Sequence, residues 1–189
     1  MSDNNELTQL ATKFLELYRC NPNVHGETKL TGKFRDRDGK CDSKSYLVKS
    51  GVTVSLWEEH IRGDKRIGCT PLQEDSSVFW GALDVDVYQK EDTLEKLNEK
   101  VNEHTLPFVV CRSKSGGAHV YLFLSEPVAA KDMIDKLKAF SAFFGQGVSE
   151  IYPKQPKIGS RKDDSKYGNW LNMPYSGNPT LQYAFNNEG

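Results

Sequence analysis

Two aspartates separated by one residue lie in an otherwise apolar stretch, residues 78–88 (VFWGALDVDVY). This composition is typical of a buried strand, in which residues i and i+2 point to the same face. The carboxylates of Asp84 and Asp86 are therefore expected side by side, where their mutual repulsion requires a nearby cation. Carboxylate oxygens are the ligands that Mg²⁺ and Mn²⁺ prefer. The pair predicts a divalent-metal site.

A glycine-rich turn precedes a histidine in residues 113–123 (SKSGGAHVYLF). Glycines allow backbone N–H groups to approach an anion closely, and serine or histidine side chains beside them can donate to phosphate oxygens. Ser115, Gly116, Gly117 and His119 are therefore candidate phosphate-binding residues. Taken alone, the same letters also fit a hairpin turn followed by a structural histidine of a sheet.

Basic residues gather in two segments, 29–49 and 154–166, and the second contains Lys154, Lys157 and Arg161. Local basic loops can follow phosphates, although a solvated loop explains either segment equally well. The whole chain of 189 residues has a net charge of −1. The charge of the chain as a whole therefore does not indicate nucleic-acid binding.

The composition indicates a soluble globular protein, with 37% hydrophobic and 27% charged residues. No stretch is long and apolar enough for a membrane span, and the polar N-terminus is not typical of a signal peptide. Four scattered cysteines without a CxxC pair favour an intracellular location with reduced thiols.

The elements that must position these residues can be predicted from periodicity and turn signals. In the first part of the chain the pattern predicts a helix over 5–19, a long loop over 20–45 with a possible hairpin near Asp38-Gly39, a short helix from 54 ending at Gly63, and a strand over 66–72. In the second part it predicts strands over 78–88, 106–112, 118–124 and 147–153, and helices over 90–104 and 129–144.

The order strand–helix–strand–strand–helix–strand is that of the split βαβ, ferredoxin-like arrangement. It predicts a four-stranded antiparallel sheet with helices on one face and the other face free for function. The first and third strands are central neighbours, and the fourth lies beside the first. Apolar alternation then places six residues on the free face: Asp84, Asp86, His119, Tyr121, Phe123 and Glu150.

Three acids and one histidine, distant in sequence, are thus expected on one surface, with His119 facing Asp86. Such a set of carboxylates can hold two ions about 3.5–4 Å apart, as in phosphoryl transfer. The alternative is that Asp84 and Asp86 are simply exposed acids on an edge strand.

These residues together resemble motifs of the archaeo-eukaryotic primase superfamily, most closely its primase–polymerase branch of phages, plasmids and mobile elements. Asp84-Val85-Asp86 is similar to its D-x-D motif, Ser115 to His119 to its S-x-G-x-H motif, and Glu150 to its third acid. The segments HIRGDKRIGCTPL (60–72) and GNWLNMPYSG (168–177) also resemble the family. The resemblance covers about residues 55 to 180.

The resemblance implies an α+β fold in which an RNA-recognition-like catalytic half packs against an N-terminal α/β unit, with a cleft at their interface. The N-terminal unit would span residues 1–77. The catalytic half, with a basic C-terminal segment, would span residues 78–189. Together the two would form one primase–polymerase core. The resemblance leaves open whether this core belongs to a longer protein.

The activity that the resemblance implies is template-directed nucleotidyl transfer, as a DNA primase, a DNA polymerase or both. Asp84, Asp86 and Glu150 would hold two Mg²⁺ or Mn²⁺ ions. Ser115, Gly116, Gly117 and His119 would bind the incoming triphosphate, and Lys154, Lys157 or Arg161 would neutralise its remaining charge. Asn169 and Asn172 would contact nucleotide or template, unless they serve a turn.

The implied partners are a single-stranded DNA template, a primer, nucleoside triphosphates and a helicase or further domains, in the cytoplasm of a bacterial host, and no membrane. Two other functions remain open. The same acids could serve a metal-dependent nuclease. A non-catalytic RNA-recognition-like module could instead stack bases on Tyr121 and Phe123.

Overall fold

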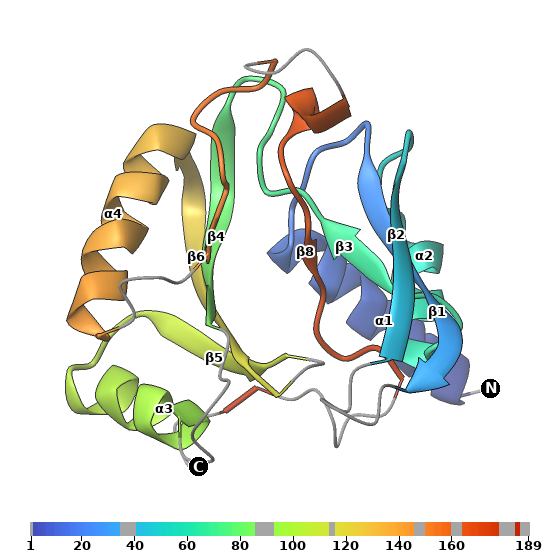
Figure 1. Cartoon of the computed structure of the whole chain (residues 1–189). Helices are drawn as coiled ribbons and strands as arrows, with labels where there is room; N and C mark the ends of the chain where they lie inside the picture. The colour runs from blue at the N-terminus through green and yellow to red at the C-terminus, as the bar shows by residue number, and fades with distance from the viewer. Residues whose placement is uncertain are drawn as a thin grey trace.

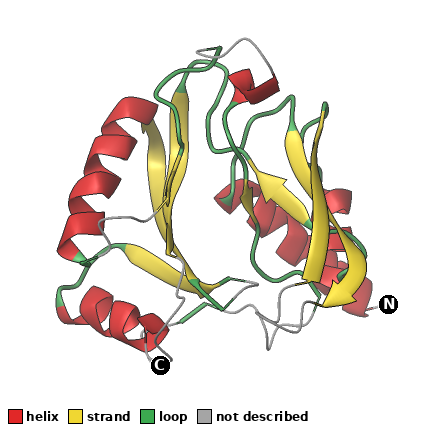
Figure 2. Ribbon diagram, in the orientation of Figure 1, coloured by secondary structure: helices red, strands yellow, loops and turns green. Residues whose placement is uncertain are grey.

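The computed structural model describes residues 2–34, 41–85, 93–113, 116–145, 150–159, 164–177 and 184–185 of the chain. They form an α+β fold with two four-stranded antiparallel sheets, of order β2-β1-β3-β8 and β5-β6-β4-β7. In Figure 1, α3 and α4 lie on the outer side of the second sheet, while α1 and α2 lie beside the first. Figure 2 shows the strands of the two sheets standing opposite each other.

The first sheet begins with a hairpin of β1 (His25–Phe34) and β2 (Cys41–Val48), paired from His25↔Val48 to Phe34↔Cys41. The prediction of a long loop over 20–45 was therefore wrong. Most described side chains of the hairpin from Lys29 onward are exposed, so the strands lack the apolar alternation that indicates a half-buried strand. The suggested turn at Asp38-Gly39 lies outside the described residues.

Two helices cover one face of the first sheet: α1 (Ser2–Leu17) and α2 (Val54–Arg62). The predicted end of the second helix is confirmed, because Gly63 forms its left-handed C-cap with φ 87°. At the other end, the Thr53 hydroxyl accepts a hydrogen bond from the Leu56 N–H at 3.2 Å. The strand β3 (Ile67–Cys69) follows and pairs with β1.

The second sheet confirms the predicted split βαβ topology. Its elements are β4 (Ser77–Val85), α3 (Thr93–Glu103), β5 (Phe108–Arg112), β6 (Ala118–Ala129), α4 (Ala130–Phe143) and β7 (Glu150–Tyr152). The central neighbours are β4 and β6, and β7 lies on the other side of β4. The first and third strands of the motif are thus central, as predicted.

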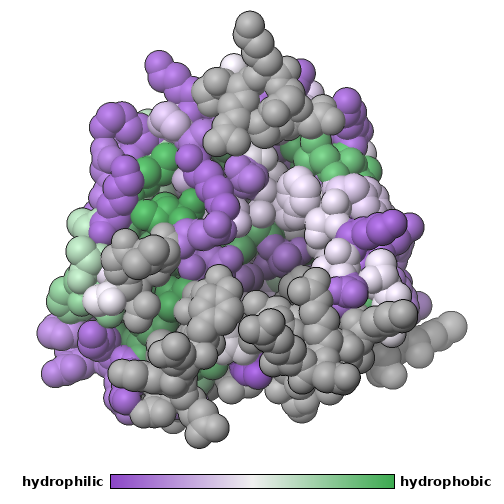
Figure 3. All heavy atoms as spheres, in the orientation of Figure 1, coloured by the Kyte–Doolittle hydropathy of each residue, from purple (hydrophilic) through white to green (hydrophobic). Residues whose placement is uncertain are grey.

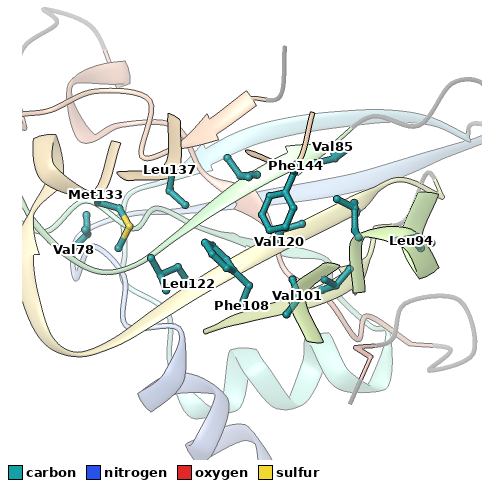
Figure 4. Close-up of a cluster of buried hydrophobic side chains, with 14 of the residues drawn as sticks. Val78, Val85, Leu94, Val101, Phe108, Val120, Leu122, Met133, Leu137 and Phe144 are labelled. Atoms are coloured by element: carbon teal, nitrogen blue, oxygen red, sulfur yellow. The ribbon is translucent and has the colours of Figure 1, made fainter. Parts of the chain in front are cut away.

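One hydrophobic core lies between the second sheet and its two helices (Figure 4). Val85, Val120 and Leu122 of the sheet pack in it with Met133 and Leu137 of α4. The alternation that assigned these strand residues to the helix-covered face is therefore confirmed.

The opposite face of this sheet is not wholly free, which corrects the sequence prediction. A second core joins Trp80 and Tyr121 of the sheet to Tyr18 and Trp57 of the N-terminal half. The Tyr18 ring lies 5.3 Å from that of Tyr121 and 5.9 Å from that of Trp80, edge to face. Burial of these rings stabilises the contact between the two halves. The part of the sheet that carries Trp80 and Tyr121 is therefore covered rather than open to a ligand.

The C-terminal part of the chain returns to the first sheet. After a short 3₁₀ helix, η1 (Asp164–Tyr167), the strand β8 (Leu171–Asn172) pairs with β3. The two halves are therefore linked by a crossing strand as well as by the second core. None of the described helices is both long and apolar enough to cross a membrane.

Candidate active site

Three of the predicted site residues form one row across three neighbouring strands. Asp84 of β4 is the direct register partner of His119 on β6 and of Glu150 on β7. Side chains directly opposite each other point to the same face of a sheet. The topology therefore brings together an acid, a histidine and a second acid that are far apart in sequence. Asp86, the other member of the aspartate pair, lies outside the described residues.

His119 is held from both sides of its ring. Its Nε2 lies 3.5 Å from Oδ1 of Asp84, and its Nδ1 lies 3.2 Å from the Tyr121 hydroxyl. An ionised Asp84 carboxylate can only accept a hydrogen bond, so the Nε2 that faces it is the ring nitrogen that carries a proton. In the neutral ring Nδ1 then accepts from the Tyr121 hydroxyl. The register partner of His119 is thus Asp84, and not Asp86 as the sequence suggested.

Glu150 lies at the open side of the row. Its Oε2 accepts hydrogen bonds from Lys154 Nζ at 2.8 Å and from the Tyr152 hydroxyl at 3.2 Å. The Lys154 contact lowers the pKa of Glu150 and keeps it ionised. Lys154 is therefore placed at the acids, whereas Lys157 is exposed and Arg161 lies outside the described residues.

The glycine turn lies against the end of β4. Gly116 has φ +86°, and a Cβ on Gly117 would stand 2.5 Å from the carbonyl oxygen of Val85. The turn closes through a hydrogen bond from the Ser113 N–H to the Gly117 carbonyl at 2.8 Å. Only glycine at position 117 allows this close approach of the turn to the strand that bears Asp84. Ser115 lies outside the described residues.

Sequence analysis missed one residue near this turn. A Cβ on Gly116 would lie 3.5 Å from Nη2 of Arg112, so this guanidinium is beside the turn. Arg112 is the register partner of Ala118 at the end of β5, a position that the predicted strand pairing could have indicated. Tyr121, which the sequence analysis placed on the same strand face as His119 and considered for base stacking, instead contacts the His119 ring.

The described acids fit a hard divalent cation by their chemistry. The side chains of Asp84 and Glu150 are 25% and 55% exposed, so solvent ions reach both carboxylates. Among the described residues no group of three His, Cys, Asp or Glu side chains is close enough to hold a metal ion. The predicted set of ligands includes Asp86, which is not among them.

Asn172 lies on the first sheet, whereas the acids and His119 lie on the second. Its Oδ1 accepts a hydrogen bond from the Thr28 hydroxyl at 3.0 Å, which joins β8 to β1. Asn169 is half-buried just before this strand. Asn172 is therefore part of the first sheet and is not a member of the acidic row on the second sheet.

A split βαβ sheet with a histidine–acid–acid row, joined to a second α/β half, is the arrangement that the resemblance to the archaeo-eukaryotic primases implies. The model of the archaeo-eukaryotic primase domain of the TOTE conflict system matches residues 20–182, and the chain belongs to this family. The match begins before the region of motif resemblance and includes the β1–β2 hairpin. A search of curated proteins found no match.

Proposed function

We propose that this protein catalyses template-directed nucleotidyl transfer, as a DNA primase, a DNA polymerase or both. The observation that carries the proposal is the row of His119, Asp84 and Glu150 on neighbouring strands of a primase-family fold. The row lies next to a glycine turn that approaches β4 closely. Carboxylates for cations and donors for a triphosphate are therefore neighbours on one surface.

The acids would hold the divalent ions of the reaction. Asp84 and Glu150 supply carboxylates from adjacent strands. Asp86, the residue that follows β4 in the sequence, would add a third carboxylate. Bound Mg²⁺ or Mn²⁺ would supply activation of the attacking 3′-hydroxyl and charge stabilisation of the pyrophosphate leaving group. The low pKa of Glu150 keeps this ligand ionised at neutral pH.

Donors around the acids would bind the triphosphate. His119 lies beside Asp84 with its ring in contact with Tyr121, and the glycine turn presents backbone near the same edge. Lys154, paired with Glu150, carries an ammonium group that can turn to a phosphate oxygen. Arg112 brings a guanidinium, which suits bidentate phosphate contacts.

The burial of Tyr121 disfavours a non-catalytic RNA-recognition-like module. Such modules stack bases on exposed aromatic residues of the sheet. Tyr121 is fully buried, and the ring of Phe123 lies 5.2 Å from that of Tyr18. The central aromatic platform that base stacking needs is therefore covered by the N-terminal half.

A synthesis assay tests the proposal. The protein is incubated with a single-stranded template, labelled nucleotides and Mg²⁺ or Mn²⁺, with and without an annealed primer. We expect template-dependent products that Glu150→Gln abolishes. Shortening of an end-labelled strand in place of elongation would assign the same acids to a nuclease, and absence of both reactions would reject a catalytic role.

A further inference from the structure

The first sheet carries a tryptophan that lies flat against two glycines. Gly26 of β1 and Gly68 of β3 are direct register partners. A Cβ added to either glycine would collide with the indole ring of Trp170. The ring therefore covers the backbone of both strands, and the absence of two side chains creates the space in which it lies.

Trp170 differs from the other two tryptophans in its exposure. Trp57 and Trp80 are fully buried, whereas Trp170 is partly exposed. Since one face of the indole lies on the glycines, the exposed area lies on the opposite face and edges. A flat aromatic surface of this kind can stack a nucleic-acid base whatever its sequence.

Polar side chains continue from Trp170 across the same face. The Thr28 hydroxyl donates its hydrogen to Oδ1 of Asn172 at 3.0 Å. In its second hydrogen bond, with the Ser45 hydroxyl at 3.0 Å, Thr28 is therefore the acceptor and Ser45 the donor. Because Oδ1 of Asn172 accepts the Thr28 bond, the amide nitrogen of Asn172 provides donors for a ligand. These hydrogen bonds fix the side chain of Asn172, two residues after Trp170.

A small recess at this place suits a phosphate oxygen. It is lined by Thr28, Arg66, Asn172 and Ser176, among others, and has room for about one water-sized group. The Ser176 hydroxyl is buried and has no hydrogen-bond partner. Within the part of the chain that the structure describes, Arg66 makes no ion pair with a carboxylate. An anion would satisfy both groups.

Among the described residues, no acid shares the face of the first sheet on which Trp170 lies. Successive residues of a strand point to opposite faces of the sheet. Ile67 and Cys69 of β3 and Leu171 of β8 point to the other face, where they pack in the core that contains α2. By the same alternation, the described residues that share the face of Trp170 are Gly26, Thr28, Leu30, Ser43, Ser45, Leu47, Arg66, Gly68 and Asn172. Figure 3 shows weakly polar, pale residues over this side of the molecule and a hollow between the two sheets.

We propose that this face binds single-stranded nucleic acid, with a base stacked on Trp170 and an adjoining phosphate held by Arg66 and Ser176. The proposal rests on the proposed function, in which this strand is the template. The donors of Asn172 and Arg66 and the lack of carboxylates suit a polyanion, whereas the acids of the second sheet repel one unless cations are bound. The incoming triphosphate has its own donors at His119 and the glycine turn.

Tryptophan fluorescence tests the proposal without any need for synthesis. The full-length protein is titrated with a short oligothymidylate in metal-free buffer. Because Trp57 and Trp80 are buried, we expect Trp170 to account for the quenching, and Trp170→Phe to lose the signal while it still binds DNA. If the oligonucleotide does not quench the wild-type fluorescence, Trp170 does not stack a base of the strand. The same conclusion follows if a nucleoside triphosphate quenches it and the oligonucleotide does not.

Variants then separate stacking from packing. Trp170→Leu should weaken oligonucleotide binding about tenfold by fluorescence anisotropy, whereas Trp170→Phe should retain most of it. Arg66→Gln should lower both the affinity and its salt dependence, with Arg62→Gln as a matched control, because Arg62 pairs with Asp64 on the surface. Equal affinities of the Leu and Phe variants, each with a melting temperature near that of wild type, would reject a stacking role.

The two proposals fail separately. If the protein elongates primers but Trp170 is not quenched, the platform is wrong and the transferase function stands. If Trp170 is quenched and no synthesis or cleavage occurs, the strand-binding face stands and the catalytic proposal is wrong.

Discussion

The hydroxyl of Tyr121 lies 3.2 Å from Nδ1 of His119, and Nε2 of the same ring lies 3.5 Å from Asp84. This chain links the buried aromatic core between the two halves to the acidic row. The fully buried tyrosine therefore holds the orientation of the His119 ring. Tyr121 is a positioning residue in the proposed reaction, since it acts through His119.

Tyr121→Phe should remove the hydrogen bond at Nδ1 of His119 and loosen the orientation of its ring. Loss of one neutral hydrogen bond is worth about 0.5–1.5 kcal/mol, so we expect a KM for nucleotide about two- to tenfold higher. Steady-state kinetics with varied nucleotide checks this, with Tyr46→Phe as the control that removes a distant hydroxyl. A change in melting temperature with an unaltered KM would assign Tyr121 to packing alone.

Asp84→Asn should abolish synthesis and preserve the fold. Asp84 is partly exposed and its replacement is isosteric, so the melting temperature should change little. Charge stabilisation by metal is worth several kcal/mol, so we expect a loss of at least about a hundredfold in rate. Glu126→Gln, an exposed acid on the same sheet, is the control. Wild-type rates for Asp84→Asn would contradict the metal-site hypothesis.

Gly117→Ala should damage the glycine turn by collision. The new Cβ would lie 2.5 Å from the carbonyl oxygen of Val85, a contact that neither backbone can avoid without movement. We expect weaker use of nucleotide and a lower melting temperature. Gly145→Ala is the control, because Gly145 has φ +73° with nothing within 4 Å and so tests backbone strain without collision. Equal losses of nucleotide use in the two variants would argue against the close approach.

The second half of the fold was predictable because its signals are local and mutually consistent. Apolar alternation in β4 and β6 and helical periodicity in α3 and α4 imply one topology, and the topology places Asp84, His119 and Glu150 in a row. The hairpin of the first half was missed because its exposed strands carry little apolar pattern. The metal-binding and catalytic roles of the row stay predictions.

Contacts between distant segments could not be predicted from periodicity. Nothing in the sequence of β8 indicates that it pairs with β3, and the packing of Trp170 on Gly26 and Gly68 depends on that pairing. Likewise, Tyr121 was expected on an open face because the ring that contacts it belongs to Tyr18, more than a hundred residues away in the chain. Alternation identifies the face of a strand, but it does not identify what covers that face.

His60 should make the protein sensitive to acid. It is buried, its Nε2 donates to the Pro174 carbonyl at 2.8 Å, and its Nδ1 accepts from the Ile67 N–H at 3.1 Å. Burial lowers its pKa from 6.5 to about 4. A lowered folded-state pKa means that the unfolded chain binds the proton first, so stability present above pH 6.5 is lost as the pH falls toward 4.

The loss attributable to His60 is on the order of 3 kcal/mol over that range. Melting temperatures measured at several pH values check this, and His60→Gln should flatten the dependence while lowering stability at neutral pH. The same acid sensitivity in His60→Gln as in wild type would assign it to other groups.

Gly26→Ala should displace Trp170 from its place on the first sheet. The added methyl group occupies the volume of the indole, which must then move away from the backbone of β1 and β3. We expect stronger quenching of the tryptophan fluorescence by acrylamide, because the ring gains exposure, and weaker quenching by oligothymidylate, because the stacking surface is no longer fixed. Gly32→Ala is the control on the same strand, since a Cβ there meets nothing within 4 Å and its φ of +90° strains the backbone without touching Trp170. If Gly26→Ala binds the oligonucleotide as wild type does while its indole is displaced, the base does not stack on Trp170.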